Sequence, residues 1–346
     1  MTLASCPLPL PNKETIVLGH GSGGTLSAEL LRSVILPAYS NPLLERLEDQ
    51  ATFDLNGTRL AFTTDSFVVK PLFFPGGDIG SLAVHGTVND LAMGGAQPRF
   101  LSVSFILEEG FAIEDLRRIV RSIGAAAERC GVPVVTGDTK VVERGSGDGV
   151  FINTSGIGVV PEGVRISAAN AKPGDAVILS GTIGDHGIAI LSQREGLELE
   201  SAIESDSAPL HDLVGAMLAV TPEIHAMRDP TRGGVASALN EIAAQSRVGI
   251  VLDERAVAVR DEVRGACELL GLDPMYVANE GKLIAIVPAG HADAILTAMR
   301  EHPLGQSAAV IGAVSDREPG LVLMRTAFGT TRIVGMLAGD QLPRIC

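Results

Sequence analysis

Residues 51–64 read ATFDLNGTRLAFTT, and this stretch decides the fold class. Two β-rich runs, 51–55 and 58–64, flank Asn56-Gly57, which is the strongest short-range signal for a β-hairpin. A dinucleotide-binding βαβ unit would need a parallel strand at this point of the chain. We therefore expect antiparallel pairing in the first half of the chain and a fold of the α+β class.

Upstream of the hairpin, residues 15–36 suggest a short strand, a glycine-rich turn and a helix that Pro37 ends. The turn, Gly19-His20-Gly21-Ser22-Gly23-Gly24, matches G-x-G-x-x-G, so a nicotinamide dehydrogenase is one alternative. The loop lacks the G-x-x-x-x-G-K-[ST] pattern of a P-loop. Its backbone N–H groups could still wrap phosphate oxygens, and a simple flexible turn is the other interpretation.

The 346 residues exceed the length at which one core usually keeps growing, so we expect two domains. The pattern breaks around residues 161–174, and we assign residues 1–165 and 166–337 to the domains and 338–346 to a flexible tail. The remaining helices are expected at 81–93, 113–130, 212–220, 233–246 and 292–300. The remaining strands are expected at 99–107, 132–136, 151–160, 176–180, 284–287, 308–314, 321–325 and 331–337.

Charge and cysteine content limit the class of protein. There are 27 Lys and Arg against 41 Asp and Glu, a net charge of −14, which argues against binding to nucleic acid or to anionic membranes. Neither a signal peptide in residues 1–13 nor a run long enough to span a bilayer is apparent, so we expect a cytoplasmic protein. The four cysteines, which have no C-x-x-C or zinc-like spacing, are expected to be reduced: Cys6, Cys130, Cys267 and Cys346.

The sequence ends Pro343-Arg344-Ile345-Cys346, which puts a thiol on a proline-stiffened tether. The neighbouring carboxylate should raise the pKa of this thiol, so Cys346 is a poor self-activated nucleophile. It is better suited to carry a group that an activated donor supplies. The alternative is an ordinary terminus without function.

Three aspartates point to a metal–nucleotide site. Asp90 lies inside an apolar helix, where a carboxylate is costly unless a cation compensates it. Asp65 follows an apolar run and Asp138 follows an expected strand, where caps or turns would also explain them. Hard oxygen ligands of this kind suit Mg²⁺ shared with nucleotide phosphates.

Other charged residues have both a functional and a structural interpretation. Lys140 could balance charge on a transferred phosphoryl group, or it could be a surface lysine. Arg232, beside two glycines, suggests an anion contact, whereas Asp229 before Pro230 is explained as a helix cap. Glu280 could be a base or part of a loop. The histidines His20, His186 and His225 are scattered and form no metal-ligand pair.

Together, these segments resemble the HypE family of hydrogenase expression/formation proteins, within the aminoimidazole ribonucleotide synthetase superfamily. The resemblance covers nearly the whole chain, and the terminal Pro-Arg-Ile-Cys separates this family from its relatives. The matching segments are 19–25, 64–66, 88–96, 137–141, 181–187, 229–234, 279–281 and 343–346.

The resemblance implies a reaction on the tail of the protein itself. A carbamoyltransferase, HypF, would load Cys346 with a carbamoyl group, and ATP-dependent dehydration would convert that group to a thiocyanate. The cyanide would pass to a HypC–HypD scaffold for the iron of a [NiFe] hydrogenase. A superfamily enzyme that acts on a diffusible amide or amidine is the alternative.

The resemblance also implies an architecture and a role for each site residue. It implies two α+β domains of mostly antiparallel sheets with helices, of which the first binds ATP and forms a homodimer. Lys140 would stabilise the phosphoryl group, Glu280 would be a base, and Cys346 would carry the substrate. The Mg²⁺ and ATP ligands would be Asp65, Asp90 and Asp138, with Gly21, Ser22, Gly23, Gly24 and Asn89 completing the nucleotide site.

Overall fold

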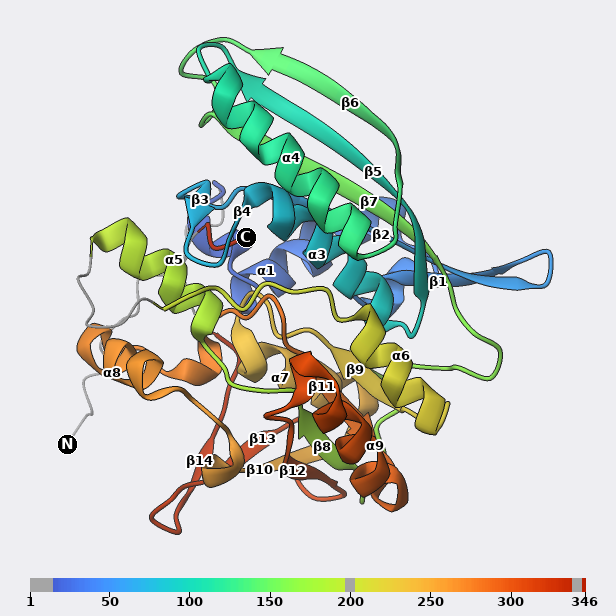
Figure 1. The fold of residues 1–346 in the computed structure, drawn as a ribbon. Helices are drawn as coiled ribbons and strands as arrows, with labels where there is room; N and C mark the ends of the chain where they lie inside the picture. The colour runs from blue at the N-terminus through green and yellow to red at the C-terminus, as the bar shows by residue number, and fades with distance from the viewer. Residues whose placement is uncertain (1–14, 197–202, 338–343) are drawn as a thin grey trace.

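The hairpin expected at residues 51–64 is present in the computed structural model as β1 (Ala51–Leu55) and β2 (Thr58–Phe67), which pair antiparallel. Its turn residues, Asn56 and Gly57, have φ angles of 50° and 81°, the left-handed conformation that a two-residue hairpin turn requires. The structure describes residues 15–196, 203–337 and 344–346. They form two halves, each built around its own sheet (Figure 1).

The first half contains a five-stranded sheet in the order β1-β2-β7-β5-β6. Its other strands are β5 (Gln97–Glu108), β6 (Val134–Val142) and β7 (Val150–Val159). Most pairs are antiparallel as expected, but β5 and β6 are parallel, joined by the crossover helix α4 (Ile113–Arg129). The strand expected at 132–136 is longer than predicted, so Asp138 lies within β6 and does not follow it.

Helices α3 (Ile79–Met93) and α4 cover one face of this sheet (Figure 1). Every residue of α3 except Asp90 is buried, because the helix packs against the sheet, against α4 and against the second half. The apolar side chains on this face form one core, which includes Phe67, Leu82, Leu101 and Ile119. The burial of α3 confirms the helix predicted at 81–93.

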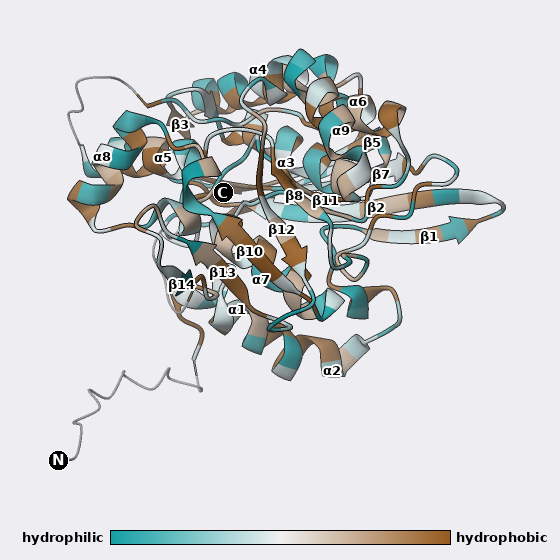
Figure 2. Cartoon of the chain, turned by 90° about the horizontal axis from the view of Figure 1, so that it is seen from below, coloured by the Kyte–Doolittle hydropathy of each residue, from teal (hydrophilic) through white to brown (hydrophobic). Residues whose placement is uncertain are grey.

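The second half contains a seven-stranded sheet in the order β14-β13-β10-β12-β8-β11-β9. Alternate residues of its strands enter two cores: Val177 and Leu179 pack toward α7, whereas Ala176 and Ile178 pack toward α6 and α9. Burial on both faces explains why these strands are continuously hydrophobic, as the brown strands of Figure 2 show. The strands are β8 (Ala176–Leu179), β9 (Ala226–Arg228), β10 (Gly249–Asp253), β11 (Ile284–Val287), β12 (Ala309–Ser315), β13 (Val322–Arg325) and β14 (Thr331–Ile333).

The helices of the second half are α5 (Asp185–Glu195), α6 (His211–Val220), α7 (Gly234–Ser246), α8 (Asp261–Leu270) and α9 (Ala289–Glu301). None of the helices formed by the described residues is long and apolar enough to cross a membrane. The predictions for residues 1–13, including Cys6, and for residues 338–343 lie outside the described part of the chain.

The N-terminal segment differs from its prediction. The short strand expected before the glycine-rich turn is absent from the described residues, since residues 15–17 are irregular and residues 18–21 form a 3₁₀ turn. Helix α1 (Thr25–Leu30) continues through a π-turn (Leu31–Ile35) into α2 (Leu36–Tyr39). Pro37 therefore lies within the first turn of α2, where its missing N–H is tolerated, and does not end the helix. Without a strand before the loop, the chain lacks the context of a dinucleotide fingerprint.

Candidate active site

The last three residues, Arg344 to Cys346, lie between the two halves of the molecule (Figure 1). Ile345 and Cys346 are only 2% and 9% exposed and belong to the core of the first half. The N–H of Val68 donates to an oxygen of the Cys346 carboxylate (3.0 Å), and the N–H of Lys70 donates to the carbonyl oxygen of Arg344 (3.3 Å). These three residues of the expected tail are thus held in place beside the segment that follows β2.

Charged side chains add to this anchoring. The guanidinium of Arg344 forms an ion pair with Asp148 and donates from Nε to the carbonyl oxygen of Val68 (3.0 Å). Arg194, from α5, donates to the carbonyl oxygen of Arg344 (2.8 Å). Asp148 precedes β7, so residues from both halves hold the tail.

His186, on α5, binds the penultimate residue of the tail. Its Nε2 lies 2.9 Å from the carbonyl oxygen of Ile345 and its Nδ1 lies 2.7 Å from the hydroxyl of Ser205. Burial lowers the pKa of His186, so the ring is neutral. Because a carbonyl only accepts, Nε2 carries the hydrogen and Nδ1 accepts from Ser205. The sequence interpretation missed this residue, having treated it as one of several scattered histidines.

Four carboxyl groups converge beside the docked tail, each from a different part of the fold. Asp229 and Glu280 are buried, and Asp65 and Asp90 are partly buried. Burial is the main cause that raises the pKa of each one. Repulsion from neighbouring carboxylates adds to the rise for Asp90, Asp229 and Glu280, whereas Arg232 opposes it for Asp65. For Asp90 and Glu280, Asp229 is the strongest of these neighbours. The group consists of Asp65 on β2, Asp90 on α3, Asp229 after β9 and Glu280 before β11.

Two oxygens of this group are unsatisfied. Oδ2 of Asp229 and Oε1 of Glu280 are buried and have no hydrogen-bond partner among the described residues. By contrast, Oδ2 of Asp90 accepts from the hydroxyl of Thr63 (2.8 Å). An unpaired buried oxygen is costly, so these two atoms mark where a cation or a proton donor would bind. Asp229 was explained from the sequence as a helix cap, and its functional position was missed.

The thiol of Cys346 lies near this group and near Arg232. Burial raises its pKa to about 12, with Glu280 and Asp65 adding to the rise and Arg232 opposing it. The docked thiol is therefore protonated and unreactive at neutral pH, in line with the expectation that Cys346 is not self-activated. The main cause is burial, however, and not the adjacent carboxylate that the sequence suggested.

The glycine-rich loop lies against Arg232. Arg232 donates to the carbonyl oxygen of Gly21 (3.1 Å), and a Cβ on Gly23, at a φ of 73°, would lie 2.7 Å from the Arg232 carbonyl oxygen. A Cβ on Gly24 would collide with the carbonyl oxygen of Leu337. Small residues are required here because two backbones approach closely. The structure thus brings residues 21–24 to the second half, beside the cation that the sequence singled out for anion contact.

A cavity of about 720 Å³ opens from this loop. It runs between α1 and α7, over residues 43–51, and reaches Asp229 and Arg232. Its volume is within the range of small-molecule sites, about 300–1,000 Å³. The loop, the unpaired Asp229 oxygen and the cavity therefore form one continuous site.

Asp138 and Lys140 are not part of this group within one chain. Asp65 and Gly137 lie in one row of the sheet, through Thr154 and Val103, and side chains at the positions of this row point to the helix-covered face. Asp138, one residue on from Gly137, points to the opposite, open face. There it pairs with Lys140 (2.7 Å), at 61% and 68% side-chain exposure, and this contact lowers the pKa of Asp138.

Asn89 lies beside these four carboxyl side chains, but its side-chain amide already forms hydrogen bonds within the protein. Its Nδ2 donates to the carbonyl oxygens of Ala208 (3.0 Å) and Glu280 (3.1 Å), and its Oδ1 accepts from the N–H of Leu210 (2.8 Å). These bonds tie α3 to the second half. A contact between Asn89 and a nucleotide stays a prediction.

The donor set is compatible with Mg²⁺ shared with phosphates. Among the described residues, no group of three or more His, Cys, Asp or Glu side chains is already arranged to hold a metal ion. Mg²⁺ usually takes only one or two carboxylates and completes its shell with water and phosphate oxygens. Asp65, Asp90 and the unpaired oxygen of Asp229 offer such ligands, whereas Asp138 would have to reach the ion from another chain.

Comparison with known proteins covers both halves. Residues 47–160 match the N-terminal domain of the AIR synthase related proteins, and residues 172–323 match the C-terminal domain. The carbamoyl dehydratase HypE of Cupriavidus necator is 60% identical over 332 residues, which cover 96% of this chain and 95% of that protein.

Solved structures give the same result. HypE in a crystal structure of a HypE–HypF complex is 50% identical, with a TM-score of 0.85 over 89% of this chain and 99% of that one. The hydrogenase maturation protein HypE in complex with ATP is 52% identical, with a TM-score of 0.81 over 96% of this chain and 100% of that one.

Proposed function

Because this chain belongs to the AIR synthase related proteins and, within them, to the HypE carbamoyl dehydratases, we propose that it converts a carbamoyl group on Cys346 to a thiocyanate with ATP. It acts in hydrogenase maturation as an ATP-dependent dehydratase. The single observation that carries the proposal is the buried position of Cys346, beside Arg232 and the four carboxyl side chains and next to the glycine-rich loop.

The chemistry explains why the carrier must be buried. The carbonyl oxygen of the S-carbamoyl group would attack the γ-phosphorus of ATP, ADP would leave, and loss of one N–H proton would give a C=N bond. Loss of the second N–H proton and of phosphate would then give the C≡N of the thiocyanate. An amide oxygen is a poor leaving group until it is phosphorylated, and exclusion of water protects the activated carbon from hydrolysis.

Each nearby residue has a role that fits its position. Glu280 has an oxygen without a partner within the described structure and is suited to take an amide proton, and burial raises its pKa, which makes its ionised form a stronger base. Arg232 would balance charge that develops on the phosphorylated oxygen. His186 would orient the tail by holding the Ile345 carbonyl.

The nucleotide would bind at the glycine-rich loop and the adjoining cavity. Backbone N–H groups of Gly21, Ser22, Gly23 and Gly24 would contact phosphate oxygens. Mg²⁺, when bound, would neutralise phosphate charge and orient the γ-phosphoryl group. Asp65, Asp90 and Asp229 would hold it, with Asp138 as a further predicted ligand.

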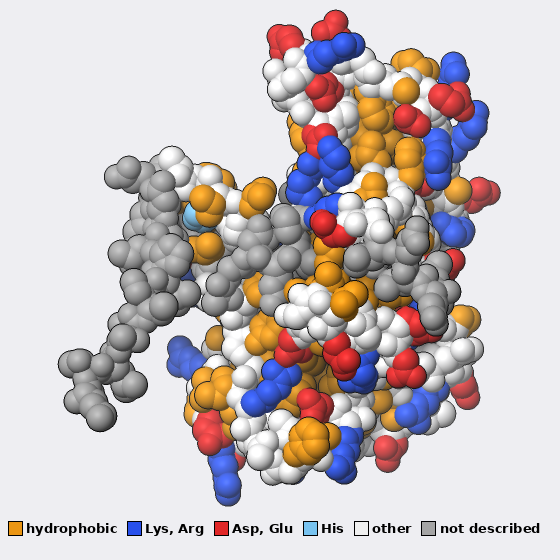
Figure 3. All heavy atoms as spheres, turned by 90° about the vertical axis from the view of Figure 1, so that its left-hand side faces the viewer, with side chains coloured by type: hydrophobic (Ala, Val, Ile, Leu, Met, Phe, Trp, Pro, Cys, Tyr) orange, Lys and Arg blue, Asp and Glu red, His pale blue; other side chains and the backbone are white. Residues whose placement is uncertain are grey.

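A second copy of the chain is proposed to complete the site. The open face of the five-stranded sheet exposes Ile106 (45%), the cross-strand neighbour of Lys140, and farther along the strands a row formed by Phe62 (42%), Ile157 (41%) and Phe100 (49%). Hydrophobic side chains are also visible on the upper part of the surface in Figure 3, the region that contains this sheet and α4. Exposed apolar sheet faces of this kind mark interaction surfaces. A homodimer across this face would bring Asp138 and Lys140 toward the partner's nucleotide.

The remaining predictions on organisation and partners enter the proposal with it. We assign ATP binding and dimerisation to residues 1–165, an α+β domain to residues 166–337 and the carrier tail to residues 338–346. HypF would load the tail, since a relative forms a complex with it, and a HypC–HypD scaffold would receive the cyanide. The protein would work in the cytoplasm.

Intact mass spectrometry tests the function directly. The protein is incubated with HypF, carbamoyl phosphate and ATP, and peptide mapping locates the change. We expect Cys346 to gain a carbamoyl group and then to lose one water when ATP is present. Turnover of a free amide by a chain lacking its last four residues would favour the diffusible-substrate alternative, which none of the comparisons supports.

A further inference from the structure

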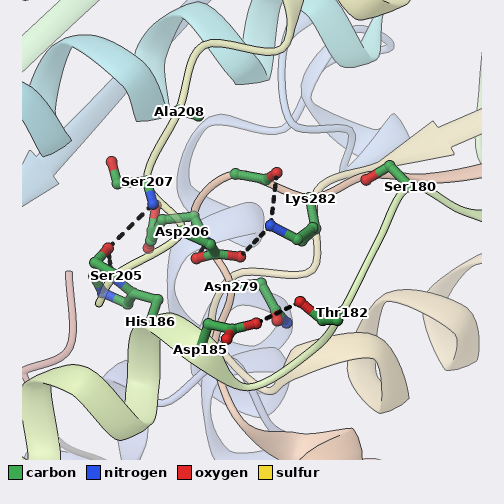
Figure 4. Close-up of polar contacts among 12 residues, drawn as sticks. Ser180, Thr182, Asp185, His186, Ser205, Asp206, Ser207, Ala208, Asn279 and Lys282 are labelled. Atoms are coloured by element: carbon green, nitrogen blue, oxygen red, sulfur yellow. Dashed lines mark hydrogen bonds and ion pairs between the residues drawn. The ribbon is translucent and has the colours of Figure 1, made fainter. Parts of the chain in front are cut away.

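Residues 203–210 form an extended strap that crosses between the two halves, and all of it lacks helix and strand. The strap contacts both halves. The hydroxyl of Ser207 lies 3.0 Å from Nδ1 of His85 on α3, and the carbonyl oxygen of Ala208 accepts from Asn89. Figure 4 shows its central residues between His186 on one side and Lys282 on the other. The strap is therefore fixed by several contacts although it has no regular structure.

The N-terminal part of the strap supports the docked tail. The N–H of Ser205 donates to the carbonyl oxygen of Pro75 (2.8 Å), and the N–H of Ser207 donates to the Ser205 hydroxyl oxygen (3.1 Å). That oxygen therefore has its own hydrogen free for Nδ1 of His186, which holds the ring with Nε2–H aimed at the Ile345 carbonyl. Loss of the Ser205 hydroxyl would remove the group that selects this tautomer.

The adjacent residue holds Glu280. Oδ1 of Asp206 accepts the backbone N–H of Glu280 (3.0 Å), and Oδ2 pairs with Lys282 Nζ (3.1 Å). Asp206 is 5% exposed and Lys282 is 14% exposed at the side chain, so the pair is shielded from water (Figure 4). The carboxylate is thus clamped between a cation and the main chain of the predicted base.

The backbones of the strap and of the loop that contains Glu280 are in direct contact at Gly281. A Cβ on Gly281 would collide with the carbonyl oxygen of Asp206 and lie 3.0 Å from the N of Ala208. Displacement of the strap would therefore be transmitted to Glu280 by steric contact as well as through the Asp206 hydrogen bond.

We propose that Ser205 and Asp206 act as one positioning element that links the docked tail to Glu280. Neither residue touches the reacting atoms. Ser205 orients His186 and so the tail, while Asp206 fixes the backbone of Glu280, and the single peptide bond between them makes the two tasks interdependent. The assignment of Glu280 as base rests on the proposed function, whereas the link between strap and tail does not.

The experiment measures the accessibility of the Cys346 thiol and the rate of dehydration separately. Alkylation of Cys346 by iodoacetamide, read by peptide mass spectrometry, reports how often the buried thiol becomes accessible. Cys130 and Cys267, which are also buried and free, are internal references for general loosening. Dehydration of preloaded carbamoyl-Cys346 is followed in the same protein as loss of water on addition of ATP.

The main variant is Asp206→Ala. Because this change leaves the mostly buried Lys282 without its ion-pair partner, Asp206→Ala/Lys282→Met is measured beside it to separate the loss of Asp206 from misfolding. We expect Cys346 to be alkylated about tenfold faster, the effect of losing one buried hydrogen bond, with Cys130 and Cys267 unchanged. We expect the dehydration rate to fall about tenfold or more while the KM for ATP stays the same. Asp206→Asn, which keeps an acceptor for the Glu280 N–H, should recover most of that rate.

Ser205→Ala tests the other half of the element, and Ser207→Ala, two residues along the same strap, is its matched control. Ser205→Ala should speed Cys346 alkylation about tenfold, and Ser207→Ala should leave it near the wild-type rate. Wild-type alkylation of Cys346 in both Asp206→Ala and Asp206→Ala/Lys282→Met would overturn the link, and wild-type dehydration in these two variants would overturn the positioning of Glu280. Failure of the wild-type protein itself to dehydrate its carbamoyl group would overturn the proposed function and leave the alkylation result standing.

Discussion

Asp65 and Asp90, near Cys346, and Asp138, on β6, were singled out by the same sequence argument, yet they lie in opposite environments. Around Cys346, burial raises the pKa of Asp65, Asp90 and Glu280. On β6, the exposed Lys140 lowers the pKa of Asp138. Burial, more than residue type, thus sets the chemistry of a carboxylate. In the proposed homodimer, one chain would hold the tail and the base, and the open sheet face of its partner would supply Asp138 and Lys140.

The largest expected effect comes from removing the carrier. Cys346→Ala should abolish carbamoyl loading and dehydration, because no other cysteine of the described structure lies beside Glu280 and Arg232. Binding of Mg²⁺–ATP, measured by calorimetry, should persist. Cys267→Ala, which removes another buried free thiol, is the matched control and should still be loaded. Normal dehydration by Cys346→Ala would exclude a tail-based reaction.

Glu280→Gln is expected to come next. It keeps the size of the side chain but cannot accept a proton, so dehydration of preloaded protein should slow by about 10²–10⁴-fold, the range for loss of a general base. Loading by the carbamoyltransferase should be unaffected, since Glu280 would act only after the tail docks. Rates are measured by rapid quench and mass spectrometry. A rate within twofold of the wild type would mean that another group removes the proton.

Lys140→Ala tests whether the two regions meet across a dimer. Loss of a charge that stabilises the phosphoryl group should slow dehydration by about 10²–10³-fold. Lys140→Ala and Cys346→Ala proteins are then mixed and allowed to exchange subunits. If Lys140 acts in trans, mixed dimers regain activity, because the Cys346→Ala chain supplies Lys140 to a partner with an intact tail. No recovery after verified exchange would assign Lys140 to its own chain or to no role in catalysis.

The smallest effect concerns stability. Because burial raises the pKa of Asp229, the folded protein holds its proton more tightly than the unfolded chain. Its stabilising contribution is therefore present at acidic pH and is lost as pH rises above the unfolded value, about 4. Asp229→Asn, measured by urea unfolding with chelator, should be more stable than the wild type at pH 8 by about 1–2 kcal/mol and should gain little at pH 5.

Asp138→Asn is the matched comparison for that measurement. The pKa of Asp138 is lowered, so its contribution has the opposite sign and would fade as pH falls. Because solvent screens this exposed pair, we expect no measurable change in stability at either pH. Destabilisation of the two variants by equal amounts would contradict the contrast between the two regions.

Much of the first half could be predicted from local sequence. Asn56-Gly57 fixed the hairpin, and the apolar run at 81–93 indicated a buried helix, because both signals arise within a few residues. The length of β6 could not be predicted in this way. Nearly all of its residues are exposed in the single chain, so the strand shows no hydrophobic alternation, and Gly137-Asp138 resembles a turn.

The sequence predicted fewer of the helices and strands of the second half. The prediction missed β9 and β10, which are short, as well as α8 and α5. Helix α5 begins with Asp185-His186-Gly187, a polar and glycine-containing start that resembles a loop. Its role depends on contacts far along the sequence, since His186 meets Ile345, 159 positions away. Sequence periodicity carries no information on such a pairing.

The same limit applies to the site. Asp90 could be found because an aspartate in an apolar helix conflicts with its surroundings, and that conflict is visible locally. Asp229 could not, because Asp-Pro before a helix already has a sufficient explanation as a cap. Its unpaired oxygen and its repulsion of Glu280 arise only when β9 and β11 become neighbours.

The amide of Asn89 has a consequence for how a nucleotide enters. Its three hydrogen bonds join α3 to Ala208, Leu210 and Glu280. A hinge motion that separated the two halves would break all three bonds at once and displace Glu280. The cavity between α1 and α7 reaches Asp229 and Arg232 and is not lined by Asn89, so a nucleotide could enter through it without breaking these bonds. The two halves could then stay joined throughout a turnover.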